Sequence, residues 1–213
     1  MTERLEKIFS VIPTCKVFAD VGCDHGYIAF EMIKREKADK VIIADISKKC
    51  LSKAEQLLYP FIEQGRAVSV VADGFNGLPD SDVGLIAGMG GEEICSILKN
   101  AKSLPKTLVL QPMKNADKVR QLAVKLGYKI QKDFVFFSAE KFYDLMLLTV
   151  GKDSLSKEEI EFGRDNIKEK NPDFIKLINA KICVLNEVLA NENLSQSAKE
   201  KLVKEKGKLE KYV

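Results

Sequence analysis

A short segment of acidic residues and glycines, from Asp20 to Gly26, separates an apolar run from a helical pattern. Glycine has no Cβ and accepts a positive φ, so Gly22 and Gly26 would let a ligand approach the backbone closely. A carboxylate at Asp20 suits a cationic amino group and repels phosphate. The pattern G-x-G-x-x-G of dinucleotide-binding turns is absent, because Asp24 stands where its second glycine is expected. The segment alone is compatible with a ligand-binding turn or a purely structural one.

Two further carboxylates follow the next two apolar runs. Asp45 ends the run at 41–44, where an α/β domain places a carboxylate that accepts both hydroxyl protons of a ribose. Asp73 and Gly74 end the third run, from which a side chain or the backbone can reach an adenine edge. Each carboxylate alone is also compatible with a solvated strand end or a helix cap. Together the three acids indicate a nucleoside with a cationic amino acid part, such as S-adenosylmethionine. The predicted cofactor contacts are Asp20, Gly22, Cys23, His25, Gly26, Asp45, Ile46, Asp73, Gly74 and Gly88.

A glycine-rich segment ends the fourth apolar run and contains Gly88, Met89, Gly90 and Gly91. Its backbone would form a pocket rim beside the reactive methyl group, so we place the target base there. A glycine-rich helix start that serves packing alone is the alternative. After the fifth run, residues 111–113 form another rim turn, whose amide would hydrogen-bond a base or cap the next helix.

These candidate residues require a framework of alternating strands and helices. Apolar runs of strand length alternate with amphipathic helical stretches, which predicts a doubly wound, Rossmann-like parallel sheet with helices on both faces. The expected strands cover 17–21, 41–46, 68–72, 83–87 and 107–110, and the expected helices cover 28–35, 48–59, 92–99 and 116–126. An additional helix at 3–12 would serve as a lid or a brace.

The last two runs, 128–137 and 142–150, are joined by only four residues. This link is too short for a crossover helix, so the two strands must pair antiparallel. From Ser154 onward, helix formers and charges dominate, and apolar residues recur at helical spacing. We expect two long helices that form a coiled-coil-like hairpin, with a break near 191–193 and Ser195 as the cap of the second helix. The predicted domains are 1–152, which binds the cofactor, and 153–213, which holds RNA, braces the fold or contacts a second copy.

Composition excludes several classes of protein. The formal charge of +3, from 34 basic and 31 acidic residues, permits nucleic acid binding but does not indicate it. Five cysteines without a C-x-x-C pair predict a reducing compartment. The charged N-terminus and the lack of a long apolar run predict a cytoplasmic protein without a membrane segment. With His25 as the one histidine, a site that needs two imidazoles cannot form, and we expect no metal. We expect a monomer or a weak homodimer.

At these motifs the sequence resembles the bacterial TrmK family of tRNA (adenine(22)-N1)-methyltransferases. The resemblance rests on D-V-G-C-D-H-G-Y at 20–27, A-D-G at 72–74, A-G-M-G-G at 87–91 and L-Q-P at 110–112, and it covers nearly the whole chain. It implies S-adenosylmethionine as methyl donor, N1 of a tRNA adenine as acceptor, and a helical C-terminal domain that helps to hold the tRNA. Two departures are Asp45, where other members carry glutamate, and Cys23, where serine is common.

Methylation of N1 leaves a cationic adenine, which a nearby carboxylate would stabilise. Asp24 is the candidate for this role, and it would later accept a proton from the exocyclic amine. His25 is the alternative, although a single histidine is more often structural. The predicted catalytic residues are Asp24, Gly88 and Met89.

The target base must leave its stack before it enters the pocket, and apolar or aromatic contacts would offset the loss of stacking. Tyr27 and Met89 are candidates for that contact, or they are packing residues. Arg4, Lys114 and Arg120 near the rim would meet phosphate. The predicted substrate contacts are Arg4, Tyr27, Met89, Gly90, Gln111 and Pro112.

Three other functions are compatible with parts of this pattern. The first is a methyltransferase of the same fold that acts on another RNA, a protein or a small molecule. The second is a non-catalytic RNA-binding module, against which the presence of Asp20, Asp45 and Asp73 together argues. The third is a nicotinamide dehydrogenase, disfavoured by the missing glycine pattern and by the antiparallel end of the sheet.

Overall fold

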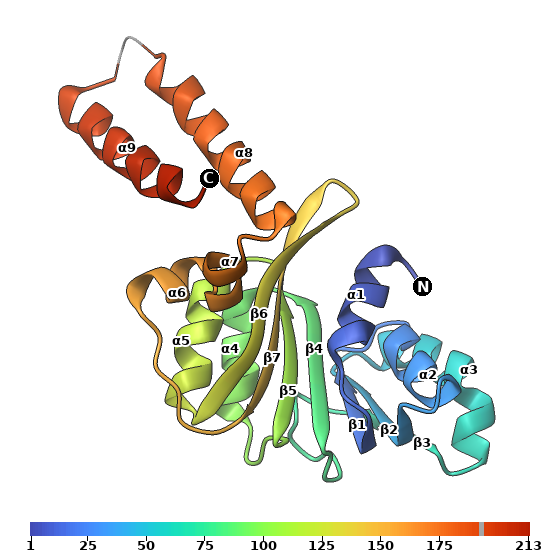
Figure 1. The fold of residues 1–213 in the computed structure, drawn as a ribbon. Coiled ribbons are helices and arrows are strands. Elements are labelled where there is room, and N and C mark those ends of the chain that lie inside the picture. The colour runs from blue at the N-terminus through green and yellow to red at the C-terminus, as the bar shows by residue number, and fades with distance from the viewer. Residues whose placement is uncertain (192–193) are drawn as a thin grey trace.

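The computed structural model describes residues 1–191 and 194–213. Within them one mixed sheet has the strand order β3-β2-β1-β4-β5-β7-β6. The first five strands in the chain pair parallel, and β7 pairs antiparallel with both β5 and β6. This arrangement confirms the predicted doubly wound sheet with an antiparallel end (Figure 1). The strands are β1 (Cys15–Val21), β2 (Ala38–Asp45), β3 (Ala67–Val71), β4 (Val83–Met89), β5 (Thr107–Pro112), β6 (Tyr128–Ser138) and β7 (Lys141–Val150).

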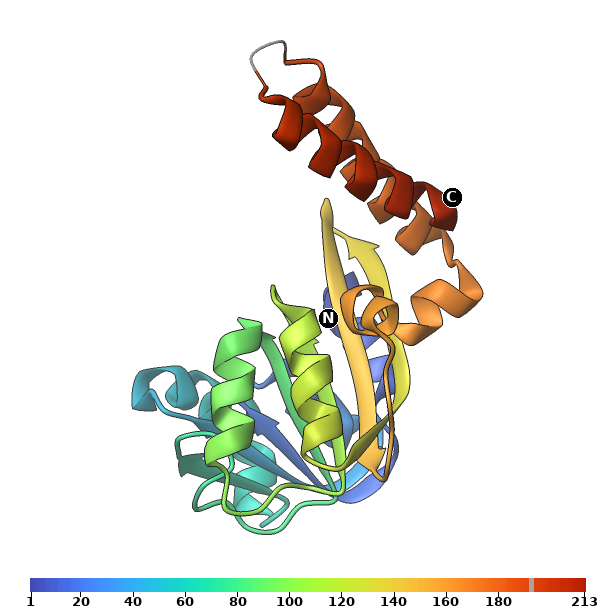
Figure 2. The same ribbon diagram turned by 90° about the vertical axis from the view of Figure 1, so that its left-hand side faces the viewer.

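Helices cover both faces of the sheet, as the alternating pattern predicted. One face carries α1 (Glu3–Val11), α2 (Tyr27–Lys34) and α3 (Lys48–Glu63), and the other carries α4 (Gly91–Asn100) and α5 (Ala116–Lys125) (Figure 2). Each face has its own apolar core, in which Phe18 and Leu108 are 0% exposed. Helix α1 contributes Ile8 and Phe9 to the first core, so it braces the sheet.

The chain after β7 differs from the simple hairpin that the sequence predicted. Two short helices, α6 (Lys157–Phe162) and α7 (Arg164–Glu169), precede the long pair α8 (Pro172–Leu189) and α9 (Gln196–Leu209). Ser195 caps α9 as expected, because its side chain accepts a hydrogen bond from the Ala198 N–H. The predicted break at 191–193 lies mostly outside the described residues. The long pair projects beyond the sheet past the β6–β7 turn (Figures 1 and 2).

Strand β6 forms one edge of the sheet, and side chains from the following segment satisfy its outward N–H groups. Four backbone N–H groups of β6 donate to side-chain oxygens: Ile130 to Asp153 Oδ2 (3.0 Å), Asp133 to Asp165 Oδ2 (2.8 Å), Val135 to Asn166 Oδ1 (2.9 Å) and Phe137 to Asp173 Oδ2 (3.1 Å). Since unpaired backbone donors at a sheet edge invite pairing with another strand, these bonds protect the edge. They also attach the helical segment to the sheet.

Candidate functional site

The parallel strands bring the predicted residues to one edge of the sheet. Asp20 in β1 lies level with Ile43 in β2 and with Leu85 in β4. The segments that follow β1, β2 and β4 therefore leave the sheet side by side. The backbone N–H groups of Gly22 and Cys23 donate to the carbonyl of Ala44, at 2.8 and 3.2 Å, and tie the loop after β1 to the end of β2.

Two glycines of this loop have the positive φ that their residue type predicted, +71° at Gly22 and +68° at Gly26. The room that each glycine provides is filled by the protein itself. A Cβ on Gly22 would lie 1.9 Å from the Met89 methyl carbon, and a Cβ on Gly26 would lie 2.8 Å from the Ala54 Cβ. Gly26 therefore allows α2 and α3 to pack closely, while Gly22 brings the first loop against the glycine-rich rim.

Asp20 is a buried carboxyl group, 6% exposed. Its pKa is raised from 3.8 to about 7, mainly by burial and in smaller part by the nearby Asp45, while a hydrogen bond from the Ala29 backbone opposes the shift. Within the described residues, no lysine or arginine forms an ion pair with Asp20. A cationic amino group beside this carboxylate would supply the missing charge, so the site fits the amino acid part of S-adenosylmethionine.

The end of β2 offers a carboxylate beside an exposed apolar side chain. The Asp45 Oδ1 atom accepts a hydrogen bond from the Ser47 N–H at 2.8 Å, which fixes the orientation of the carboxylate. Ile46 is 73% exposed. An oriented carboxylate next to an apolar side chain suits ribose hydroxyls and a flat base.

The end of β3 matches its prediction only in part. Asp73 is exposed, as a ligand contact requires. Gly74 is buried with a φ of +65°, and a Cβ there would lie 2.6 Å from the Ile97 side chain. Gly74 therefore serves the packing of α4, and the exposed side chain of Asp73 is the group at this strand end that is open to a ligand.

Asp24 projects from the loop into solvent and contacts two basic side chains. Its Oδ2 atom lies 2.7 Å from His25 Nδ1, and its Oδ1 atom lies 3.5 Å from Lys53 Nζ in α3. The His25 ring stacks on Tyr27, with a centroid separation of 5.4 Å. The tyrosine is 49% exposed, so its ring forms an accessible flat surface beside the loop.

The glycine-rich rim meets helix α1 through Arg4. The Arg4 Nη2 atom lies 3.0 Å from where a Cβ on Gly88 would stand, and the guanidinium group lies 5.4 Å from the Tyr143 ring centroid. Arg4 Nε donates to Gln111 Oε1 at 2.9 Å. Burial lowers the pKa of Arg4. A half-buried cation therefore lies directly at the rim where the base was placed.

In the rim turn at residues 111–113, the first two residues are more deeply buried than the sequence predicted. Gln111 is 0% exposed, and its amide is engaged by Arg4 and by the carbonyl of Pro112, to which Nε2 donates at 3.0 Å. Pro112 is also buried. The predicted contact of the Gln111 side chain with a base is therefore blocked, because this side chain holds α1 and the rim together, whereas the Met113 side chain is 45% exposed.

Comparisons with known proteins agree with this geometry. A family model described as a methyltransferase domain matches residues 1–146, which is more than half of the chain. The chain belongs to the methyltransferase-domain family. Two solved structures have the same fold over the whole of this methyltransferase. Mycoplasma capricolum TrmK with S-adenosyl-homocysteine is 23% identical, covers 100% of this chain and 97% of its own, and has a TM-score of 0.87.

The second structure is a Streptococcus pneumoniae protein in complex with S-adenosyl-L-methionine. It is 23% identical, covers 100% of this chain and 99% of its own, and has a TM-score of 0.88. The tRNA (adenine(22)-N(1))-methyltransferase of Bacillus subtilis is 26% identical over 192 residues, which cover 83% of this chain and 79% of that one. These similarities confirm the resemblance to TrmK proteins.

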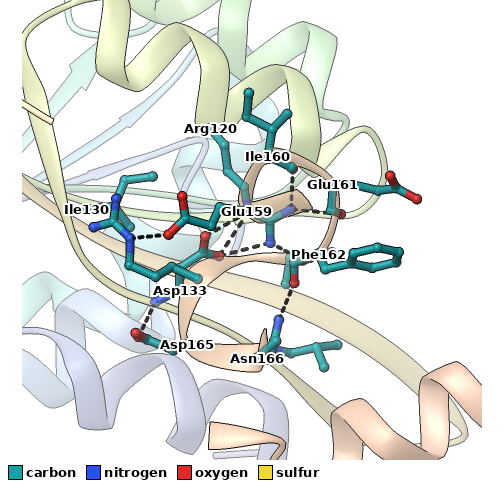
Figure 3. A network of polar contacts seen from close by, with 12 residues as sticks. Arg120, Ile130, Asp133, Glu159, Ile160, Glu161, Phe162, Asp165 and Asn166 are labelled. Atoms are coloured by element: carbon teal, nitrogen blue, oxygen red, sulfur yellow. Dashed lines mark hydrogen bonds and ion pairs between the residues drawn. The ribbon is translucent and has the colours of Figure 1, made fainter. Parts of the chain in front are cut away.

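One predicted phosphate contact of the methyltransferase is wrong. Arg120 is 1% exposed, and it binds the carboxylates of Asp133 and Asp144 together with two carbonyl groups of α6 (Figure 3). Arg120 lies on the buried face of α5 beside Val119 and Ala123. A guanidinium held by two carboxylates inside the protein cannot reach a nucleic acid, so its role is to attach α6 to α5 and the sheet.

Sequence reasoning missed this ion pair network and the contact between Lys53 and Asp24. The periodicity of α5 contained a signal for the first, because it places Arg120 on the apolar face. Among residues 1–191 and 194–213, no three histidine, cysteine or acidic side chains gather as metal ligands. None of the described helices has the length and apolar character that crossing a membrane requires.

Proposed function

We propose that this methyltransferase transfers a methyl group from S-adenosylmethionine to N1 of adenine 22 in a tRNA. The observation that carries the proposal is the contact of Met89 with Gly22, which joins the acidic loop after β1 to the glycine-rich rim after β4. The acidic side suits the donor, and the rim suits a planar acceptor. The activity named for the Bacillus subtilis relative supports this choice of acceptor.

Carboxylates at three strand ends would hold the cofactor. Asp20 would pair with its amino group, Asp45 with the ribose hydroxyls, and Asp73 with the adenine edge, while Ile46 would cover one face of the adenine. The cofactor supplies an electrophilic methyl group when bound. The protein contributes orientation, which is worth roughly 7 to 11 kcal/mol in well-aligned reactions.

The acceptor side is formed by residues around the rim. The Tyr27 ring is accessible for stacking on the displaced adenine, and the Arg4 guanidinium would attract a neighbouring phosphate. Asp24 would stabilise the positive charge that develops on the adenine, and its contacts with His25 and Lys53 hold the carboxylate at the loop. Lys199, Lys201 and Lys204 of α9, which form none of the ion pairs of the described residues, would meet more distant phosphates.

The test is nucleoside mass spectrometry of a single tRNA after incubation with the enzyme and S-adenosylmethionine. We expect N1-methyladenosine at position 22 and none in a transcript with guanine at that position. A product at another base, or methylation of small molecules alone, would overturn this proposal.

We further propose that the enzyme acts in the cytoplasm, as its five free cysteines suggest, and that it is a monomer or a weak homodimer.

A further inference from the structure

The base of helix α8 is attached to the end of β6 through one residue, Phe137. The backbone N–H of Phe137 donates to Asp173 Oδ2 at 3.1 Å, and the ammonium group of Lys176 lies 3.2 Å from the centre of the Phe137 ring. Asp173 and Lys176 both belong to the first turns of α8. Backbone and side chain of the same residue are thus bound by the same helix, and we call these three residues the Phe137 joint.

Other contacts that hold the α8–α9 pair to the rest of the protein are made with α6 and with the end of β6. The Lys181 ammonium group of α8 lies 5.7 Å from the centre of the Phe162 ring, and Lys208 of α9 pairs with Glu161.

The buried residues of α8 are Phe174 and Ile178, both near its start, and they pack in a cluster with Val135 of β6 and Tyr212 near the C-terminus. Farther along, Val184 and Val188 are 57% and 41% exposed. The outer part of the helical pair is therefore held through its base.

A small tilt at this base has a large effect at the far end. Helix α8 has 18 residues. At 1.5 Å per residue it is about 27 Å long, so a tilt of about 10° moves its outer end by about 5 Å. A displacement of that size would misplace the lysines of α9 relative to a bound nucleic acid.

The joint is also connected to the rim of the site. Ser138 follows Phe137, and its hydroxyl donates to Glu3 Oε2 at 2.9 Å. Glu3 precedes Arg4, whose guanidinium lies against Gly88. A continuous series of contacts thus runs from the start of α8, over the β6–β7 turn, to the place where the base is expected.

We infer that the Phe137 joint sets the angle of the α8–α9 pair so that a tRNA held by this pair presents its adenine to the rim. Asp173 and Lys176 are therefore positioning residues for the tRNA substrate. The inference rests on the proposed function, since it assumes that tRNA is the acceptor. It assigns no contact with the cofactor or with the reacting atoms.

The test compares the double variant Asp173→Ala/Lys176→Met with the control Asp165→Ala. Asp165 makes the same kind of bond to the same strand edge, at Asp133, but it precedes α8. In the double variant we expect the KM for tRNA to rise about five- to tenfold, because a partly buried hydrogen bond and a cation–π contact at the base of α8 are lost together. The kcat at saturating tRNA and the affinity for S-adenosyl-homocysteine should stay within about twofold.

Two results separate positioning from stability. Asp165→Ala should lower Tm about as much as the double variant but leave the KM for tRNA unchanged. The single variant Asp173→Asn keeps Lys176 and an oxygen acceptor at position 173, so its KM for tRNA should equal that of the wild type. A normal KM in the double variant, or an equal rise in Asp165→Ala, would overturn the inference.

Small-angle X-ray scattering supplies a readout that does not depend on activity. The double variant should show a broader distribution of interatomic distances than the wild type, and Asp165→Ala should not. If the wild type fails to methylate tRNA, the proposed function fails, whereas the scattering result still decides whether the joint fixes the helices. An unchanged distribution in the double variant would reject the joint itself.

Discussion

Arg120 and Asp133 form a bidentate ion pair in which both side chains are 1% exposed, with Nε 2.8 Å from Oδ2 and Nη2 2.9 Å from Oδ1. The same guanidinium binds Asp144, which is one-third exposed. The pair joins α5 to β6, and the carbonyl groups of Ile160 and Glu161 join α6 to it. This pair therefore makes α6 part of the methyltransferase fold.

Replacing Arg120 by Met should destabilise the protein strongly, because it leaves the Asp133 carboxylate buried without its cation. Removing one partner of a buried pair costs about 3 to 5 kcal/mol. Urea denaturation measures this change in the free energy of unfolding. Arg35→Met is the matched control, since Arg35 pairs with Glu6 and Glu31 at the surface, its side chain is 44% exposed, and surface ion pairs add little to stability. Equal losses in both variants would contradict the assigned role of Arg120.

Asp20 should make stability depend on pH. Because burial raises its pKa from 3.8 to about 7, the folded state holds a proton that the unfolded state has already lost. This contribution to stability is complete below about pH 4 and is lost as the pH rises through 7. Asp20→Asn has no carboxyl group at this position and lacks this dependence. As the pH rises from 5 to 8, its free energy of unfolding relative to the wild type should therefore increase, which urea denaturation measures. A constant difference over that range would exclude a raised pKa.

Asp24 and Asp45 should affect different steps of the reaction. Asp24→Ala should lower kcat about 10²- to 10⁴-fold, as loss of acid–base or charge stabilisation does, and change the affinity for S-adenosyl-homocysteine only a few-fold. Asp45→Ala should weaken that affinity, because it removes the acceptor for the ribose hydroxyls. Calorimetry and methylation rates of both variants check this division. An active Asp24→Ala enzyme would remove the residue from the mechanism.

Gly22 and Met89 should be coupled in stability. Gly22→Ala places a methyl group where the Met89 methyl lies and forces alanine into a positive φ, which costs about 1 to 2 kcal/mol even without the clash. Met89→Ala removes the clash but not the backbone strain. The double variant should therefore be more stable than the sum of the single variants by about 0.5 to 3 kcal/mol, measured by chemical denaturation. Additive losses would show that the two residues do not press on each other.

The sequence predicted the parallel part of the sheet well because each of its strands contains a short run of mostly apolar residues followed by turn residues. The run at 41–44, for example, lies in the fully buried part of β2. The antiparallel end followed from the length of the link before β7 alone. The site edge was predictable for the same reason, since carboxylates such as Asp45 directly follow these runs.

Other features depend on contacts between segments that are distant in the sequence, and local residue patterns predict such contacts poorly. The positive φ at Gly26 was predicted from its residue type. The residues around Gly26 in the sequence do not indicate that Ala54 of α3 fills the space beside it. The helices α6 and α7 have six residues each, too few for a clear periodicity, and they are held by side chains such as Asn166 that bond to β6. The phosphate contact predicted for Arg120 is wrong because its position on the apolar face of α5, and not its charge, decides where its side chain lies.

The acceptors along β6 also limit how this protein can associate with copies of itself. A strand from another molecule that added to this edge would have to displace Asp153, Asp165, Asn166 and Asp173 from the N–H groups that they already bind. Three of these residues bring negative charge to the edge, which an incoming backbone cannot replace. The segment that carries the C-terminal helices therefore also guards the sheet against growing into an aggregate.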